Sequence, residues 1–214
     1  MIESEKPLQN PLHNLIFFFK ELRRLARISD AHSIARRLFV TNSFDGLIST
    51  LGIILGGYLG DVKDPTAYIY TVAGGMLALG IFSGMIATYL SERAERLREL
   101  HETEKVMLHK LDDSIYAKVA RYVPVYVAFW SGIGALLLPL LTLVPFVIAS
   151  YFGTTSFPLE IAIAASTSIA LLELFLIGCY LGKISGENKL LNGLKFVGIG
   201  LTAAATLLAL KVVF

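Results

Sequence analysis

Apolar stretches and shorter polar segments alternate along this chain from residue 38 onwards. Five of the apolar stretches are close to the 20 or so residues that a helix needs to cross the hydrocarbon of a bilayer. They cover residues 38–60, 67–90, 123–151, 159–181 and 194–213. The pattern predicts an all-α, polytopic membrane protein with five transmembrane helices. An odd number of spans places the two termini on opposite sides of the membrane.

No helix breaker follows the second span. Helix-forming charged residues continue directly from residue 91, so we expect span 2 to extend into the cytosol as a long helix. The charged segment 91–121 is the sizeable polar insert of the membrane domain. In the third span, Pro139 and Pro145 remove backbone hydrogen bonds and should kink the helix, whereas Pro124 is expected in its first turn.

Residues 1–35 are expected to form a cytosolic N-terminal segment, and residues 36–214 the membrane domain. Residues 15–27 place apolar side chains on one helical face and Lys and Arg largely elsewhere, which is typical of a helix lying in the membrane interface. We predict that it packs on the cytoplasmic ends of the spans, with specific partner binding as the alternative. The N-terminus lacks the residue order of a signal peptide, so the first span is expected to direct insertion.

Composition supports a membrane protein, because 55% of the residues are hydrophobic and the mean hydropathy is +0.64. A formal net charge of +2 is too small to indicate a nucleic-acid partner. All but Lys63 and Lys211 of the 19 Lys and Arg lie before span 1, between spans 2 and 3, or in the link 183–195. Because these residues accumulate on the cytoplasmic side, the N-terminus is expected in the cytoplasm. The single Cys179 excludes an intrachain disulfide and a thiolate metal cluster.

An ionisable residue, Asp45, lies about two turns inside the basic end of the first span. A carboxylate in hydrocarbon costs several kcal/mol unless it faces a partner, a cavity or an ion. Asn42 adds an oxygen donor of the kind that hard divalent cations prefer, and Met85 in span 2 offers a thioether to a transition metal. The alternatives are that Asp45 pairs with Arg36 or Arg37 or sits at the membrane interface, and that Met85 is a packing residue.

A stripe of acidic residues follows span 2. Spacings of three, four and three residues place its glutamates on one helical face, and a histidine and an aspartate continue the stripe at about 100° per residue. The candidate metal-collecting side chains are Glu92, Glu95, Glu99, Glu102, His109 and Asp113. Such a stripe would lead a cation from water toward the membrane. The alternative is ordinary surface ion pairs of Glu92 with Arg96, Glu95 with Arg98, and Glu102 with Lys105.

Glu173, past the middle of the fourth span, is a further candidate for the transport path. Protonated, its side chain could hydrogen-bond another span; ionised, it could relay protons or bind an ion. The sequence has no phosphate-binding glycine loop, no HExxH and no serine with a plausible base, so we do not expect an enzyme. No cofactor is expected either.

Several short motifs resemble the vacuolar iron transporter family. They are TNSFDGLIST at 41–50 before a glycine-rich first span, SGM at 83–85 before a glutamate-bearing helix, GALLLP at 134–139, and NGL at 192–194. The resemblance implies a dimeric five-span exporter of ferrous iron or manganese that exchanges metal for protons. It also implies that Asp45 and Met85 line the path and that the glutamates after span 2 collect metal. Phe44 differs from the asparagine usual in that family, and the insert is shorter.

Two functional hypotheses follow from these patterns. The first is an antiporter for Fe²⁺ or Mn²⁺ that serves metal ion homeostasis, with the bilayer, the metal ion and a second copy of the chain as partners. The alternative is a non-transporting membrane scaffold whose charged helix 91–121 binds a cytosolic partner.

Overall fold

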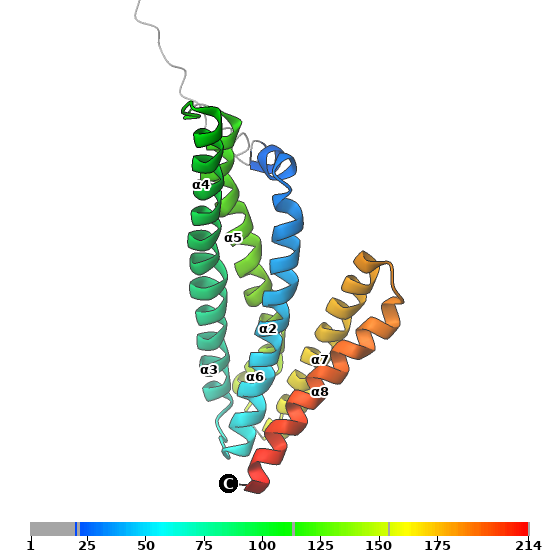
Figure 1. Ribbon diagram of the computed structural model, residues 1–214. Helices are drawn as coiled ribbons and strands as arrows, with labels where there is room; N and C mark the ends of the chain where they lie inside the picture. The colour runs from blue at the N-terminus through cyan, green and yellow to red at the C-terminus, as the bar shows by residue number, and fades with distance from the viewer. Residues whose placement is uncertain (1–19, 21, 113, 154, 214) are drawn as a thin grey trace, which may run out of the picture.

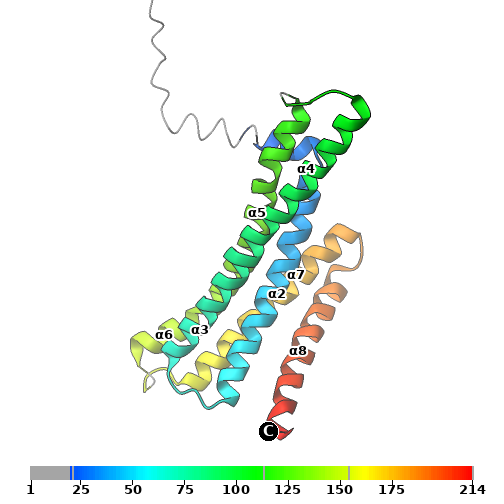
Figure 2. The ribbon, with the colours of Figure 1, turned by 60° about the vertical axis from the view of Figure 1, so that its left-hand side comes forward.

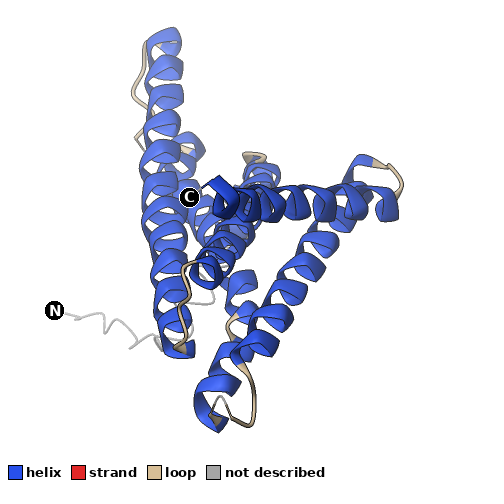
Figure 3. Ribbon diagram, turned by 90° about the horizontal axis from the view of Figure 1, so that it is seen from below, coloured by secondary structure: helices blue, strands red, loops and turns tan. Residues whose placement is uncertain are grey.

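The computed structural model describes residues 20, 22–112, 114–153 and 155–213, and every regular element among them is a helix (Figure 3). The elements are α2 (Ala31–Leu59), α3 (Pro65–Leu77), the π-helix η1 (Ala78–Ala87), α4 (Thr88–Met107), α5 (Ile115–Thr142), α6 (Val144–Phe152), α7 (Leu159–Ser185) and α8 (Lys189–Val213). Five helical units are long and apolar enough to cross a membrane. The predicted all-α fold with five spans is therefore confirmed.

The first spanning helix, α2, begins earlier than expected. It starts at Ala31 rather than near residue 38, directly after Asp30, whose left-handed φ of 54° ends the preceding helical segment 22–28. Leu25 and Ala26 of that segment are buried against Ala31 and Val127. The described part of the amphipathic segment thus packs on the ends of α2 and α5, as predicted; residues 15–19 and 21 lie outside the described residues.

The second span and its charged extension form one continuous helical unit from Pro65 to Met107. Asp64 caps its start, because its carboxylate accepts the Thr66 N–H at 2.9 Å, and the hydrogen bonds from Thr66 lower the pKa of Asp64. The predicted long extension is confirmed. The ten-residue π-helix η1 in its middle was not predicted.

The third span is broken between α5 and α6 at Leu143. Pro145 stands in the first turn of α6, and Pro139 lies inside α5 one turn before the break. The predicted kink is thus confirmed. The prediction that Pro124 lies in the first turn of span 3 was wrong. The helix that contains span 3 already begins at Ile115, inside the charged segment 91–121, so Pro124 lies in the helix interior.

Helix α5 is the centre of the bundle. It packs against α2 on one side and against η1 and α4 on the other, and α7 and α8 pack on each other and on α2 (Figures 1 and 2). One apolar cluster joins α2 to α7 through Leu47, Leu51, Ala170 and Leu174. Toward its turn the α7–α8 hairpin leans away from α2 (Figure 1).

Candidate functional site

A hydrogen-bonded polar cluster joins three helices inside the apolar bundle. The side-chain amide of Asn42 in α2 donates to Ser131 of α5, at 2.6 Å to Oγ and 3.2 Å to the backbone carbonyl. Thr88, at the start of α4, shares a hydrogen bond of 3.0 Å with the same hydroxyl. Ser131 is fully buried, so these contacts hold the three helices in one register.

Met85 lies directly beside this cluster, over Gly132 of α5. A Cβ built on Gly132 would stand 2.9 Å from Met85 Cε and 2.6 Å from the carbonyl oxygen of Gly80. A Cβ on Gly84 would stand 2.8 Å from the Gly132 Cα. Glycines on both helices thus let η1 and α5 approach backbone to backbone, and the Met85 side chain occupies the remaining space.

Asp45 projects from the outer surface of the bundle. Its side chain is exposed, and among the described residues it makes no hydrogen bond or ion pair. The pairing with Arg36 or Arg37 considered above is therefore not observed. Gly46, the next residue, packs inward, and a Cβ there would stand 3.0 Å from the Ala135 carbonyl oxygen, whose helical donor is missing because residue 139 is proline.

The exposed face of α2 carries small and polar residues along its length. Thr41, Asp45, Gly52 and Gly56 are separated by multiples of one helical turn, so they share one face. A Cβ built on Gly52 or Gly56 would meet nothing within 4 Å. These glycines leave room for another helix to approach this face closely.

Glu173 lies in a different part of the bundle. It is 4% exposed, and both carboxyl oxygens are buried without a hydrogen-bond partner among the described residues. It shares a face of α7 with Ser166, whose hydroxyl donates to the Thr142 carbonyl of α5 at 2.7 Å. No contact links Glu173 to Asn42 or Met85, so the structure does not join the four path candidates into one site.

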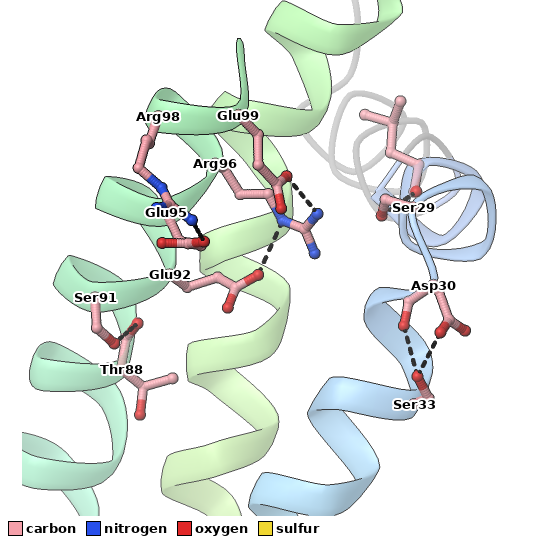
Figure 4. A network of polar contacts seen from close by, with 11 residues as sticks. Ser29, Asp30, Ser33, Thr88, Ser91, Glu92, Glu95, Arg96, Arg98 and Glu99 are labelled. Carbon is pink, nitrogen blue, oxygen red and sulfur yellow. Dashed lines mark hydrogen bonds and ion pairs between the residues drawn. The ribbon is translucent and has the colours of Figure 1, made fainter. Parts of the chain in front are cut away.

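The glutamates after span 2 lie on α4, and most of them are engaged by arginines (Figure 4). Arg96 contacts Glu92 at 2.9 Å and Glu99 at 3.0 Å. Arg98 pairs with Glu95. These are the partners that the alternative interpretation gave for Glu92 and Glu95. The Glu95 pair is on the surface, whereas the Glu92 and Arg96 side chains are only 14% and 12% exposed. Within the described part of the chain, Glu102 has neither an ion pair nor a hydrogen bond to its side chain.

The stripe is shorter than its spacing predicted. α4 ends at Met107, and Leu108 takes a left-handed φ of 51°, so His109 lies beyond the helix and does not continue the stripe. Asp113 lies outside the described residues. In the described ranges, no group of three or more His, Cys, Asp and Glu is arranged to hold a metal ion. The metal-collecting role of these side chains therefore stays a prediction.

Comparison with known proteins places the chain in a family. It is 30% identical over 171 residues to the uncharacterized protein MJ0645 of Methanocaldococcus jannaschii, covering 78% of this chain and 84% of that protein. The chain belongs to the MJ0645 family. No family model and no solved structure matches it. Because that relative is itself uncharacterized, membership assigns no activity.

In this member of the MJ0645 family, the sequence analysis missed Ser131, Thr88 and Gly132. Small and hydroxyl-bearing residues are frequent in every span of the chain, so composition alone does not separate these three from packing residues. A signal for two of them is the adjacent small residues Ser131 and Gly132 inside an apolar span. Together with Asn42 and Met85 they offer a hydroxyl, an amide and a thioether within the membrane.

Proposed function

We propose that this member of the MJ0645 family is a homodimeric exporter of a divalent transition metal, Fe²⁺ or Mn²⁺, that exchanges metal for protons. The observation that carries the proposal is Asp45, an intramembrane carboxylate on the surface of the single chain without a partner among the described residues. The motif resemblance to vacuolar iron transporters supports the same function.

In this proposal a second copy of the chain packs against the exposed face of α2 that carries Asp45. A carboxylate at the centre of a span costs about 2.5–3.5 kcal/mol on insertion scales, which is the upper bound for Asp45 two turns inside its span. Burying the α2 face against its symmetry mate would remove Asp45 from lipid, and Gly52 and Gly56 allow the close approach. A twofold interface would also bring the two copies of Asp45 to the same seam.

Two carboxylates at one seam would offer a divalent cation hard, anionic ligands. Asn42 and Met85 lie inside the bundle at α5 and not at the seam, so in this proposal they form a separate position on the path. A thioether beside oxygen donors favours a transition metal over Ca²⁺ or Mg²⁺. In this proposal Glu173 carries the exchanged proton, since it is a buried carboxyl group inside a span and has no hydrogen-bond partner among the described residues.

The basic segments of the chain support export from the cytosol. The helical segment 22–28, the end of α4 and the turn between α7 and α8 lie toward one end of the molecule, opposite the C-terminus (Figure 1). All but Lys63 and Lys211 of the 19 Lys and Arg belong to residues 1–37, 91–121 or 183–195, which favours a cytosolic location for this end and an N-in, C-out orientation. The acidic face of α4 would then meet cytosolic metal first.

A detergent thermal-shift series tests the metal specificity of the proposal. A ligand that binds only the folded state must stabilise it, so Fe²⁺ or Mn²⁺ at about 100 times its dissociation constant should raise the unfolding temperature by about 5 °C or more. Ca²⁺ and Mg²⁺ at the same concentration serve as controls and should leave it unchanged. Equal curves with every ion and with none would contradict the proposed function.

The scaffold alternative is favoured by the cytosolic tip of α4. Val106 and Leu108 are 86% and 93% exposed, which is unusual for apolar side chains outside a membrane span. The exposed pair of Glu95 with Arg98 below them is also what a surface helix would show. A scaffold predicts that no divalent ion changes the unfolding temperature, so the same series separates the two functions.

A further inference from the structure

A groove of about 810 Å³ lies between the helical segment 22–28 and the first half of α5. Arg23 and Arg27 line it on one side, and Phe129 and Trp130 line it on the other. These two aromatic side chains are 49% and 39% exposed, and they belong to a membrane-spanning unit. Guanidinium groups next to exposed aromatic rings are the residue combination of a membrane–water interface.

The packing of the helical segment 22–28 fixes where its arginines stand. Its buried residues Leu25 and Ala26 face α2 and α5. Arg23 and Arg27 are four residues apart, so they share a helical face, and both are exposed. Within the described chain, neither forms a hydrogen bond or an ion pair. The groove therefore presents two adjacent cations that no described group of the protein neutralises by contact.

The other titratable groups of the groove already have hydrogen bonds. The Asp30 carboxylate accepts the Ser33 hydroxyl at 2.9 Å. His32 Nδ1 lies 3.0 Å from the hydroxyl of Tyr126, a further lining residue. With two arginines against one aspartate, the lining keeps a positive formal charge.

We propose that this groove binds one anionic phospholipid from the leaflet at the basic end of the protein. Arg23 and Arg27 hold the phosphate and the charged headgroup, and an acyl chain lies against Phe129 and Trp130. Basic pockets between transmembrane helices are suited to anionic headgroups, because charge-assisted hydrogen bonds are strong where water is partly excluded. A zwitterionic lipid is disfavoured, because its own cation accompanies the phosphate and leaves the positive groove uncompensated.

The site provides its own reporter, because Trp130 is the single tryptophan of the chain. The full-length protein is reconstituted in bilayers that contain phosphatidylglycerol or phosphatidylcholine with brominated acyl chains, which quench a tryptophan they touch. We expect the anionic lipid to bind beside Trp130 about five-fold or more tightly than the zwitterionic one. Equal quenching by the two lipids would overturn the proposal.

Paired variants locate the preference. In Arg23→Gln/Arg27→Gln, the preference for the anionic over the zwitterionic lipid is expected to fall to less than about two-fold. Arg23→Lys/Arg27→Lys should retain most of this preference, because the charge remains. Arg36→Gln/Arg37→Gln removes two exposed arginines outside this groove and should leave it intact. A preference that survives Arg23→Gln/Arg27→Gln, or that inorganic phosphate abolishes, would refute a lipid site here. The proposal depends on the membrane placement of α5 and not on metal transport.

Discussion

Asp45→Asn is expected to reduce divalent metal uptake into proteoliposomes to the level of protein-free vesicles. The substitution keeps the size of the side chain and removes its charge, so the seam between two copies would lose both anionic ligands. Folding should survive, because a neutral amide is less costly than a carboxylate at this depth of the membrane. The measurement is Mn²⁺ uptake at fixed protein density, with the elution volume in size-exclusion chromatography as the check on folding.

Asp61→Asn is the matched control for this experiment. Asp61 is an exposed aspartate in the turn after α2, where it pairs with Lys63 at 3.1 Å, and it lies outside the spanning helices. Uptake by this variant should equal that of the unmodified protein. Full uptake by Asp45→Asn would remove this carboxylate from the transport path and leave the scaffold as the better account.

Gly132→Ala is expected to cost about 2 kcal/mol of stability and to displace Met85. The added methyl group would lie well inside van der Waals contact with the Met85 side chain and 2.6 Å from the Gly80 carbonyl oxygen. Backbone on the far side leaves little room to relax, and overpacking of this kind typically costs 1–3 kcal/mol, hence about 2 kcal/mol here. The free energy of unfolding, measured by denaturant titration in mixed micelles, checks the prediction.

Gly74→Ala separates packing from helix propensity. A Cβ on Gly74 in α3 would meet no atom within 4 Å. The exchange should therefore leave stability unchanged or raise it by up to about 1 kcal/mol, since alanine is the better helix former. If both alanine variants behaved alike, the close contact between η1 and α5 would not exist in the membrane.

The spans were predictable because length and hydropathy act over many residues at once. Each span needs about 20 apolar residues, and the second span continues into α4 because no glycine or proline interrupts residues 88–107. The position of Pro145 similarly predicted the break at Leu143. Helix ends were less predictable: α2 begins at Ala31 because the polar residues before the first span also form helix.

The candidate site was only partly predictable. Asn42 and Met85 were predicted from the chemistry of their side chains. Their neighbours Ser131 and Gly132 belong to another helix. The sequence pattern within one helix does not show which residues of another helix it contacts. The π-helix around Met85 has no sequence signal distinct from that of an α-helix. For Glu92 and Glu95, one spacing fitted both a metal-collecting stripe and intrahelical ion pairs, and the structure shows the ion pairs.

The account depends most on what covers the outward face of α2. Cys179 is the single cysteine, so Gly52→Cys in a Cys179→Ala background leaves one thiol on that face. At a twofold seam the Cα atoms of residue 52 in the two copies of the chain should come within the roughly 7 Å that a disulfide can bridge. Leu172→Cys, on an exposed position of α7, is the matched control.

Mild oxidation of native membranes is therefore the decisive measurement. We predict a covalent dimer from the Gly52→Cys variant and only monomer from the Leu172→Cys variant. Monomer alone from Gly52→Cys, and likewise from Gly56→Cys and Ser49→Cys, would contradict a second copy on this face and leave Asp45 without the partner that the proposed function requires.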